Sequence, residues 1–393
     1  MLWDITQQTA AMLVERETPL EAEHLLSSLV GIWERTDLGG DDPVEVIGVH
    51  VVDAAEAEAS PRAFALLRGL AVFGGERIAP RAHAAASRLA ELRTEAPAWV
   101  DSLGGATLRE SWKTTEPFGD GDNVTLVLQH EGYAPHAISV FIDHNLDSIA
   151  KDVFVSPHPD RLRALWKGEE DFTVVGIDPQ EAADALAQGL FVEESFEESP
   201  ATDELQGMRP LLRAYLWTLP PPRPIRHPTM SDGDRDRLAV EFAASPEVSE
   251  LASEVVDDLA WRMIDFARDH SDGDPLRWSP VVVELFMADW LPGRALLEVP
   301  LDAVPDAVRA WVRFAGRRRG LPERLIDEAV AAVGQWEDEF AHAMQDRSRF
   351  GPTKAVLSAM LDQGIDITDE AAMETWTREF NALTQEERRK VLP

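Results

Sequence analysis

The sequence predicts a mainly α-helical protein with a central α+β domain. Apolar residues recur at helical spacing through the first hundred residues, two alternating segments rich in Val, Ile and Thr follow, and helical spacing returns after a proline-rich stretch. We therefore expect helical N-terminal hairpins, a small sheet that contains a β-hairpin, and an all-α C-terminal domain. The expected boundaries are 1–101, 102–219, a linker at 220–231, and 232–393.

The N-terminal domain is expected to consist of antiparallel helical hairpins of the solenoid kind. Helices are predicted over residues 6–15 and 19–34, and two more are separated by Gly74-Gly75. No fixed repeat period accompanies them.

The central hairpin is predicted from residues 123–130 and 136–143, joined by a short loop. Side chains alternate along a strand, so His130 and His136 should lie near each other at the turn. His144 should lie about 26 Å from His136, at roughly 3.3 Å per residue, which excludes a shared metal ion. A further strand at 171–178 should lead into a helix with Asp178 as its N-cap.

The C-terminal domain is predicted to be built around one buried helix. Ser279 and Pro280 provide its N-cap and first residue, and Leu291-Pro292 is expected to end it. Helices at 305–319 and 322–346 should follow. Thr368 should cap a last helix.

Charge and composition narrow the classes of function. A formal net charge of −34 disfavours nucleic acid as a partner, and the absence of cysteine excludes disulfides and thiolate metal sites. The chain has neither an apolar run long enough to cross a membrane nor a signal-peptide pattern at its start, so a cytoplasmic protein is expected. No cofactor is predicted. The expected partner is another protein or a second copy of the chain.

The segment VFIDHNLDSIAKDVF (140–154) is the candidate catalytic site. Asp143, His144 and Asp152 at the end of a strand suit acid–base or metal chemistry, with Lys151 as an electrostatic partner. A structural interpretation explains the same residues: Asn145 would cap a short helix in which Asp147 pairs with Lys151. The sequence leaves both interpretations open.

A second candidate is an arginine stripe at helical spacing. Arg309, Arg313 and Arg317 would line one helix face, where they could bind an anion or partner. The alternative is a solvated face that pairs with the acidic helix that follows.

The segments DHNLDSIAKD, WSPVVVELFMADWLP and TREFNALTQEERRKVL resemble a group of proteins from high-G+C actinobacteria, in which a D-H-N segment follows a hairpin. The resemblance implies no activity. The composition favours an acidic protein-interaction or scaffold module that docks a basic partner. The alternative is a hydrolase-type enzyme that uses Asp143, His144 and Asp152, with or without a metal ion.

Overall fold

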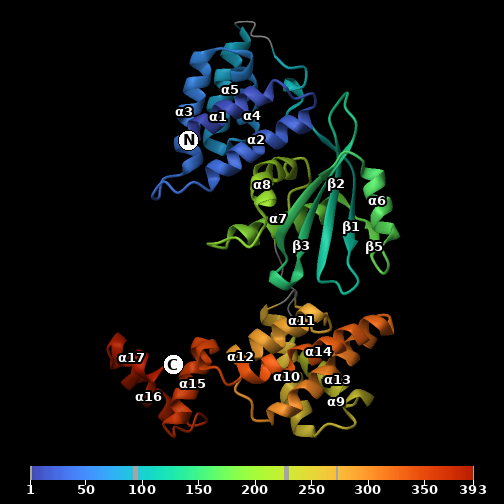
Figure 1. Ribbon diagram of the computed structural model, residues 1–393, viewed down its shortest axis with the longest axis vertical. Coiled ribbons are helices and arrows are strands. Elements are labelled where there is room, and N and C mark those ends of the chain that lie inside the picture. The colour runs from blue at the N-terminus through green and yellow to red at the C-terminus, as the bar shows by residue number, and fades with distance from the viewer. Residues whose placement is uncertain (1, 92–95, 225–229, 271–272, 393) are drawn as a thin grey trace. The chain divides into compact units, whose positions relative to one another are not determined.

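The computed structural model describes residues 2–91, 96–224, 230–270 and 273–392, and the chain divides into two compact units (Figure 1). The first unit is Met1–Arg226 and the second is His227–Pro393. Their boundary falls inside the predicted linker, of which residues 225–229 lie outside the described part. The protein is mainly helical with a central α+β region, as predicted. Within the described residues, no helix has the length and apolarity needed to cross a membrane.

Five helices open the first unit. They are α1 (Leu2–Leu13), α2 (Pro19–Glu34), α3 (Pro43–Glu58), α4 (Pro61–Phe73) and α5 (Gly75–Glu91). Thr18, Asp42 and Ser60 cap α2, α3 and α4, and a proline is the first residue of each of these helices. Proline suits this position because the N–H that it lacks has no partner inside the helix.

The central sheet has five strands in the order β4-β3-β2-β1-β5. The strands are β1 (Thr107–Thr115), β2 (Gly121–Gln129), β3 (His136–Asp143), β4 (Ile149–Ser156) and β5 (Thr173–Gly176), and every neighbouring pair is antiparallel. The predicted hairpin is confirmed as β2 and β3, with Val124 opposite Val140.

The short helix predicted after Asn145 is wrong. Only a 3₁₀ turn, His144–Leu146, follows β3, and Ile149–Ser156 then forms β4. Asp147 and Ser148 adopt left-handed backbone angles, with φ of 56° and 61°, which no right-handed helix can contain. Pairing with β3 therefore decides the structure of this segment, and Lys151 occupies a bulge opposite Phe141 and Ile142.

The two faces of the sheet pack against different helices (Figure 1). One face, which includes Leu126, Ile138 and Val140, shares a single core with the N-terminal helices, α7 (Pro179–Glu194) and α8 (Asp203–Leu216). The other face packs Trp112 against Leu162 of α6 (Pro159–Gly168). The predicted domains 1–101 and 102–219 therefore have one continuous core within the first unit.

Close contact between α2 and α8 joins these two parts. A Cβ at Gly31 of α2 would lie 2.8 Å from the carbonyl oxygen of Gln206, so a larger residue would push the helices apart. At the same crossing, Ser27 donates to the Gly207 carbonyl and accepts from the Leu211 N–H.

The second unit is helical throughout the residues that the structure describes. Its elements are α9 (Asp232–Ala243), α10 (Ser253–His270), α11 (Pro280–Glu284), α12 (Leu291–Arg294), α13 (Val304–Arg319), α14 (Glu323–Ala343), α15 (Pro352–Asp362), α16 (Glu370–Ala382) and α17 (Gln385–Val391). Ser279 caps α11 as predicted, and its hydroxyl accepts from the Val282 N–H. Asp369, and not Thr368, caps α16.

The buried helix of the second unit does not end at Leu291-Pro292 as predicted. A π-helical turn, Leu285–Trp290, joins α11 to α12, so the helix continues to Arg294. A π turn changes which backbone groups pair. It can therefore accommodate Pro292, which has no N–H to donate to the helix. Phe286 packs here against Trp278 and Trp290, so these tryptophans form part of the core of the second unit.

Candidate functional site

Asp143 and Lys151, two of the predicted site residues, bind each other. The carboxylate of Asp143 lies 2.7 Å from Lys151 Nζ and also accepts from the Asn145 N–H at 2.9 Å. Asp143 therefore closes the 3₁₀ turn after β3 and neutralises the bulge residue of β4. Both contacts are structural, and they occupy both carboxylate oxygens.

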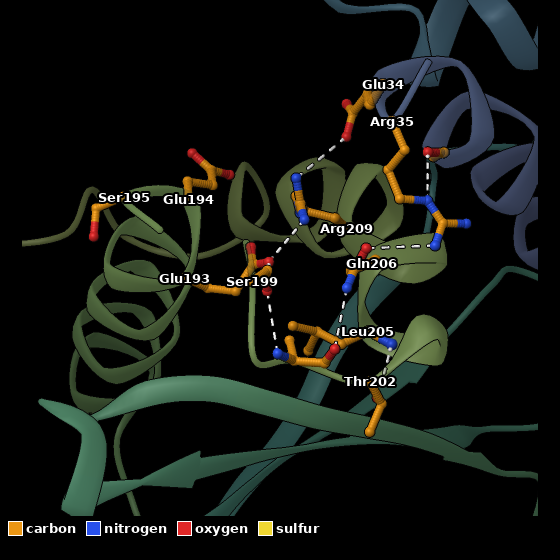
Figure 2. A network of polar contacts seen from close by, with 12 residues as sticks. Glu34, Arg35, Glu193, Glu194, Ser195, Ser199, Thr202, Leu205, Gln206 and Arg209 are labelled. Carbon is orange, nitrogen blue, oxygen red and sulfur yellow. Dashed lines mark hydrogen bonds and ion pairs between the residues drawn. The ribbon is translucent and has the colours of Figure 1, made fainter. Parts of the chain in front are cut away.

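Asp152 points to a different part of the first unit. Its carboxylate accepts from the Thr202 hydroxyl at 2.8 Å, and Thr202 caps α8 through the Leu205 N–H. Figure 2 shows Thr202 at the edge of a polar network at the start of α8. In that network Arg209 binds Glu193, a fully buried carboxylate on α7. Asp152 thus helps to fix α8 on the sheet and forms no contact with His144.

His144 instead joins Asp122 and Ser148 in a continuous array. Its Nε2 lies 3.1 Å from Asp122 Oδ2, at the start of β2, and its Nδ1 lies 2.9 Å from the Ser148 hydroxyl. The backbone fixes this geometry from both sides, because the His144 N–H donates to the Asp120 carbonyl and Ser148 is held in the left-handed region. A serine, a histidine and an aspartate therefore form one hydrogen-bonded chain at the end of the sheet.

The environment of Asp122 determines which groups donate and which accept in the Ser148–His144–Asp122 array. Burial acts to raise the pKa of Asp122, but hydrogen bonds from His144 and Thr115, with the charge of Lys113, bring that pKa below its usual value. An ionised Asp122 accepts only, so His144 Nε2 carries a proton and donates it. In this tautomer the lone pair is on Nδ1 and faces the Ser148 hydroxyl.

Lys113 connects this array to the first turn of α7. Lys113 Nζ lies 3.4 Å from Asp122 Oδ2 and 3.9 Å from Glu181 Oε1. The side chains of Asp122 and His144 are 12% and 19% exposed, and Ser148 is half-buried. Ser148 is therefore partly exposed to solvent, while Asp122 is mostly shielded from it.

A second polar cluster joins the N-terminal helices to the hairpin. Glu23 of α2 is fully buried and accepts from the Gly104 N–H at 2.7 Å, from His130 Nε2 at 3.0 Å and from the Tyr215 hydroxyl. Burial, together with the negative charge of Glu23, raises the pKa of Tyr215 well above its usual value, which keeps the phenol protonated as a donor.

The predicted proximity of His130 and His136 is confirmed. Their rings stack with centroids 5.6 Å apart. Burial and the neighbouring His130 lower the pKa of His136 to about 4, so it is neutral at physiological pH. Among the described residues, no group of three or more His, Asp or Glu side chains is placed to hold a metal ion.

Two arginines of the stripe on α13 form ion pairs within the second unit. Arg309 binds Asp306 and Glu337, and Arg317 binds Glu247 at 2.8 Å. No ion pair of Arg313 is found in the described part of the chain, and its side chain is half-buried. These contacts fit the solvated-face interpretation of the stripe.

Sequence reasoning singled out His144 but missed both of its partners. Asp122 lies 22 residues before His144 in the sequence, and Ser148 falls inside the short helix of the structural interpretation. The β-branched and aromatic residues of IAKDVFVS carried the missing signal, since a strand there places Ser148 in the connecting turn. Comparisons with protein-family models, with curated proteins and with solved structures found no match for this chain.

Proposed function

We propose that the first unit is a hydrolase-type enzyme in which Ser148 is the nucleophile, His144 the general base and Asp122 the group that orients His144. The single observation that carries this proposal is the continuous Ser148–His144–Asp122 array, with contacts of 2.9 and 3.1 Å. A serine hydroxyl is a weak nucleophile by itself and needs an adjacent base that a third group orients.

The reaction class that fits is acyl transfer to water. Ser148 Oγ attacks the carbonyl carbon of an ester, its proton passes to His144 Nδ1, and the imidazolium gives that proton to the departing alcohol. Water then cleaves the acyl-serine with the same base, which releases the carboxylic acid and regenerates Ser148. Asp122 stabilises the imidazolium and is not protonated.

The test is hydrolysis of an activated aryl acetate by the full chain. We expect Ser148→Ala to lower the rate to that of the uncatalysed background, because no hydroxyl remains next to His144. Ser156→Ala is the matched control: Ser156 is also half-buried and lies on the same sheet, but its hydroxyl accepts from the His158 N–H and is not part of the array. A rate that Ser148→Ala leaves unchanged would refute the proposal.

Protein binding is a second candidate, supported by one exposed aromatic residue. Trp217 follows α8 with 87% of its surface exposed and lines a cavity of about 730 Å³ with Phe73 and Pro210. Exposed tryptophan is typical of binding hot spots, and the net charge of −34 suits a basic partner segment.

This second candidate predicts that Trp217→Ala weakens binding of a labelled peptide of alternating Arg and Leu at least tenfold, as measured by fluorescence anisotropy. Trp261→Ala, which removes a tryptophan that is 38% exposed in the second unit, should leave the affinity unchanged. Equal affinity of the wild type and Trp217→Ala would reject this surface as the binding site.

A further inference from the structure

The second unit contains a buried lysine that pairs with no acidic residue in the described part of the chain. Lys354 of α15 is 2% exposed, and its Nζ donates to the Pro292 carbonyl at 2.6 Å. The remaining neighbours of Nζ are Met344 Sδ at 3.9 Å and the ring of Phe350, whose centroid is 4.2 Å away. Within the described residues, no carboxylate forms an ion pair with Lys354.

A charge in this position is costly without a counter-charge. Burial and the positive charge of Arg262 lower the pKa of Lys354 to about 8, so at neutral pH the side chain is still mostly an ammonium ion. The Pro292 carbonyl stabilises it in part, because carbonyls near the end of a helix favour cations. That contact gives Lys354 a structural role but supplies no counter-charge.

Lys354 also lines a cavity of about 500 Å³, a size typical of small-molecule sites. The walls are mostly apolar, with Leu297, Val299 and Phe350 among the lining residues. The other charged lining groups are Arg347 and Asp362, and these neutralise each other through two contacts of 2.5 and 3.0 Å. The uncompensated charge on this cavity is therefore a single positive one.

We propose that this cavity binds a small organic carboxylate with an apolar body, whose carboxylate group pairs with Lys354. One positive charge matches a monoanion, and the apolar walls match a hydrocarbon chain or ring. The buried hydroxyl of Ser358, which also lines the cavity, is a further donor for a carboxylate oxygen. The site lies wholly in the second unit and does not depend on the function proposed for the first.

Calorimetric titration of the full chain with octanoate tests this site, and octanamide is the matched neutral ligand. We expect octanoate to bind, and octanamide, which has the same chain length but no charge, to bind at least tenfold more weakly. Equal affinities of wild-type protein for the two ligands would overturn the proposal, and so would the absence of octanoate binding. Both outcomes come from the unaltered protein.

The variant Lys354→Met removes the positive charge from the protein, whereas octanamide removes the negative charge from the ligand. Methionine fills a similar volume but carries no charge, so it should reduce octanoate affinity at least tenfold and leave octanamide affinity nearly unchanged. Circular dichroism will show whether the variant is folded. Undiminished octanoate binding by a folded variant would show that Lys354 does not provide the counter-charge.

Discussion

Glu23→Ala is expected to lower the free energy of unfolding of the first unit by about 3–5 kcal/mol. The Gly104 N–H, the His130 ring and the Tyr215 hydroxyl all donate to this one carboxylate, which is fully buried. Alanine leaves the buried His130 ring and Tyr215 hydroxyl without this acceptor in a place that water does not reach, whereas Gly104 is exposed. Each unsatisfied buried group costs about 1–3 kcal/mol, and partial relaxation reduces the sum.

Urea unfolding, monitored through hydrogen exchange at the amides of β2 and β3, measures this change in the free energy of unfolding. Glu45→Ala is the control, because Glu45 pairs with Arg77 on the surface of the same unit, where such pairs contribute about 0–1 kcal/mol. Glu23→Gln keeps one carbonyl acceptor and should fall between the two variants. A loss for Glu23→Ala no larger than that for Glu45→Ala would show that the cluster does not stabilise the fold.

Asp122→Asn is expected to lower the rate of ester hydrolysis by about 10⁴-fold, the usual effect of removing the acid from a serine triad. Asparagine keeps the shape of the side chain but removes the charge that holds the Nε2 proton of His144. The ring can then take the other tautomer, with a proton on Nδ1, and can no longer accept from Ser148. Steady-state kinetics over a range of pH will measure the loss.

Asp143→Asn distinguishes the Ser148–His144–Asp122 array from the site predicted from sequence, which contains Asp143. Asp143 lies at the same edge of the sheet but binds Lys151 and the Asn145 N–H, not the imidazole. We therefore expect this variant, where folded, to keep its rate within a few-fold of wild type. A loss at Asp143→Asn equal to that at Asp122→Asn would favour the site predicted from sequence, which uses Asp143, His144 and Asp152.

Local signals in the sequence were sufficient for most of the fold. The caps at Thr18, Asp178 and Ser279 each combine a side-chain acceptor with proline as the next residue, so the helix starts can be predicted from neighbouring residues alone. The hairpin was predictable for the same reason, since β2 and β3 are adjacent along the chain. Strand β5, at the other edge of the sheet, was also expected from its own composition.

Non-local contacts account for what sequence analysis missed. The residues of β4 could also be predicted as a helix, with Asn145 as its cap and Asp147 paired with Lys151. Pairing with β3 decides in favour of the strand. The catalytic candidate shows the same dependence. His144 and Ser148 are close in sequence, but Asp122 reaches them only because β2 and β3 pair in one register, with Gly121 opposite Asp143. No spacing rule for a single chain predicts that contact.

Mass mapping of a fluorophosphonate adduct tests the central claim, nucleophilic Ser148, most directly. The phosphorus of the reagent bonds covalently to an activated serine oxygen and releases fluoride. We predict one adduct, on the peptide that contains Ser148, and its loss in His144→Ala, which removes the base. An unlabelled wild-type protein, or labelling of Ser148 that His144→Ala does not reduce, would contradict the proposed array.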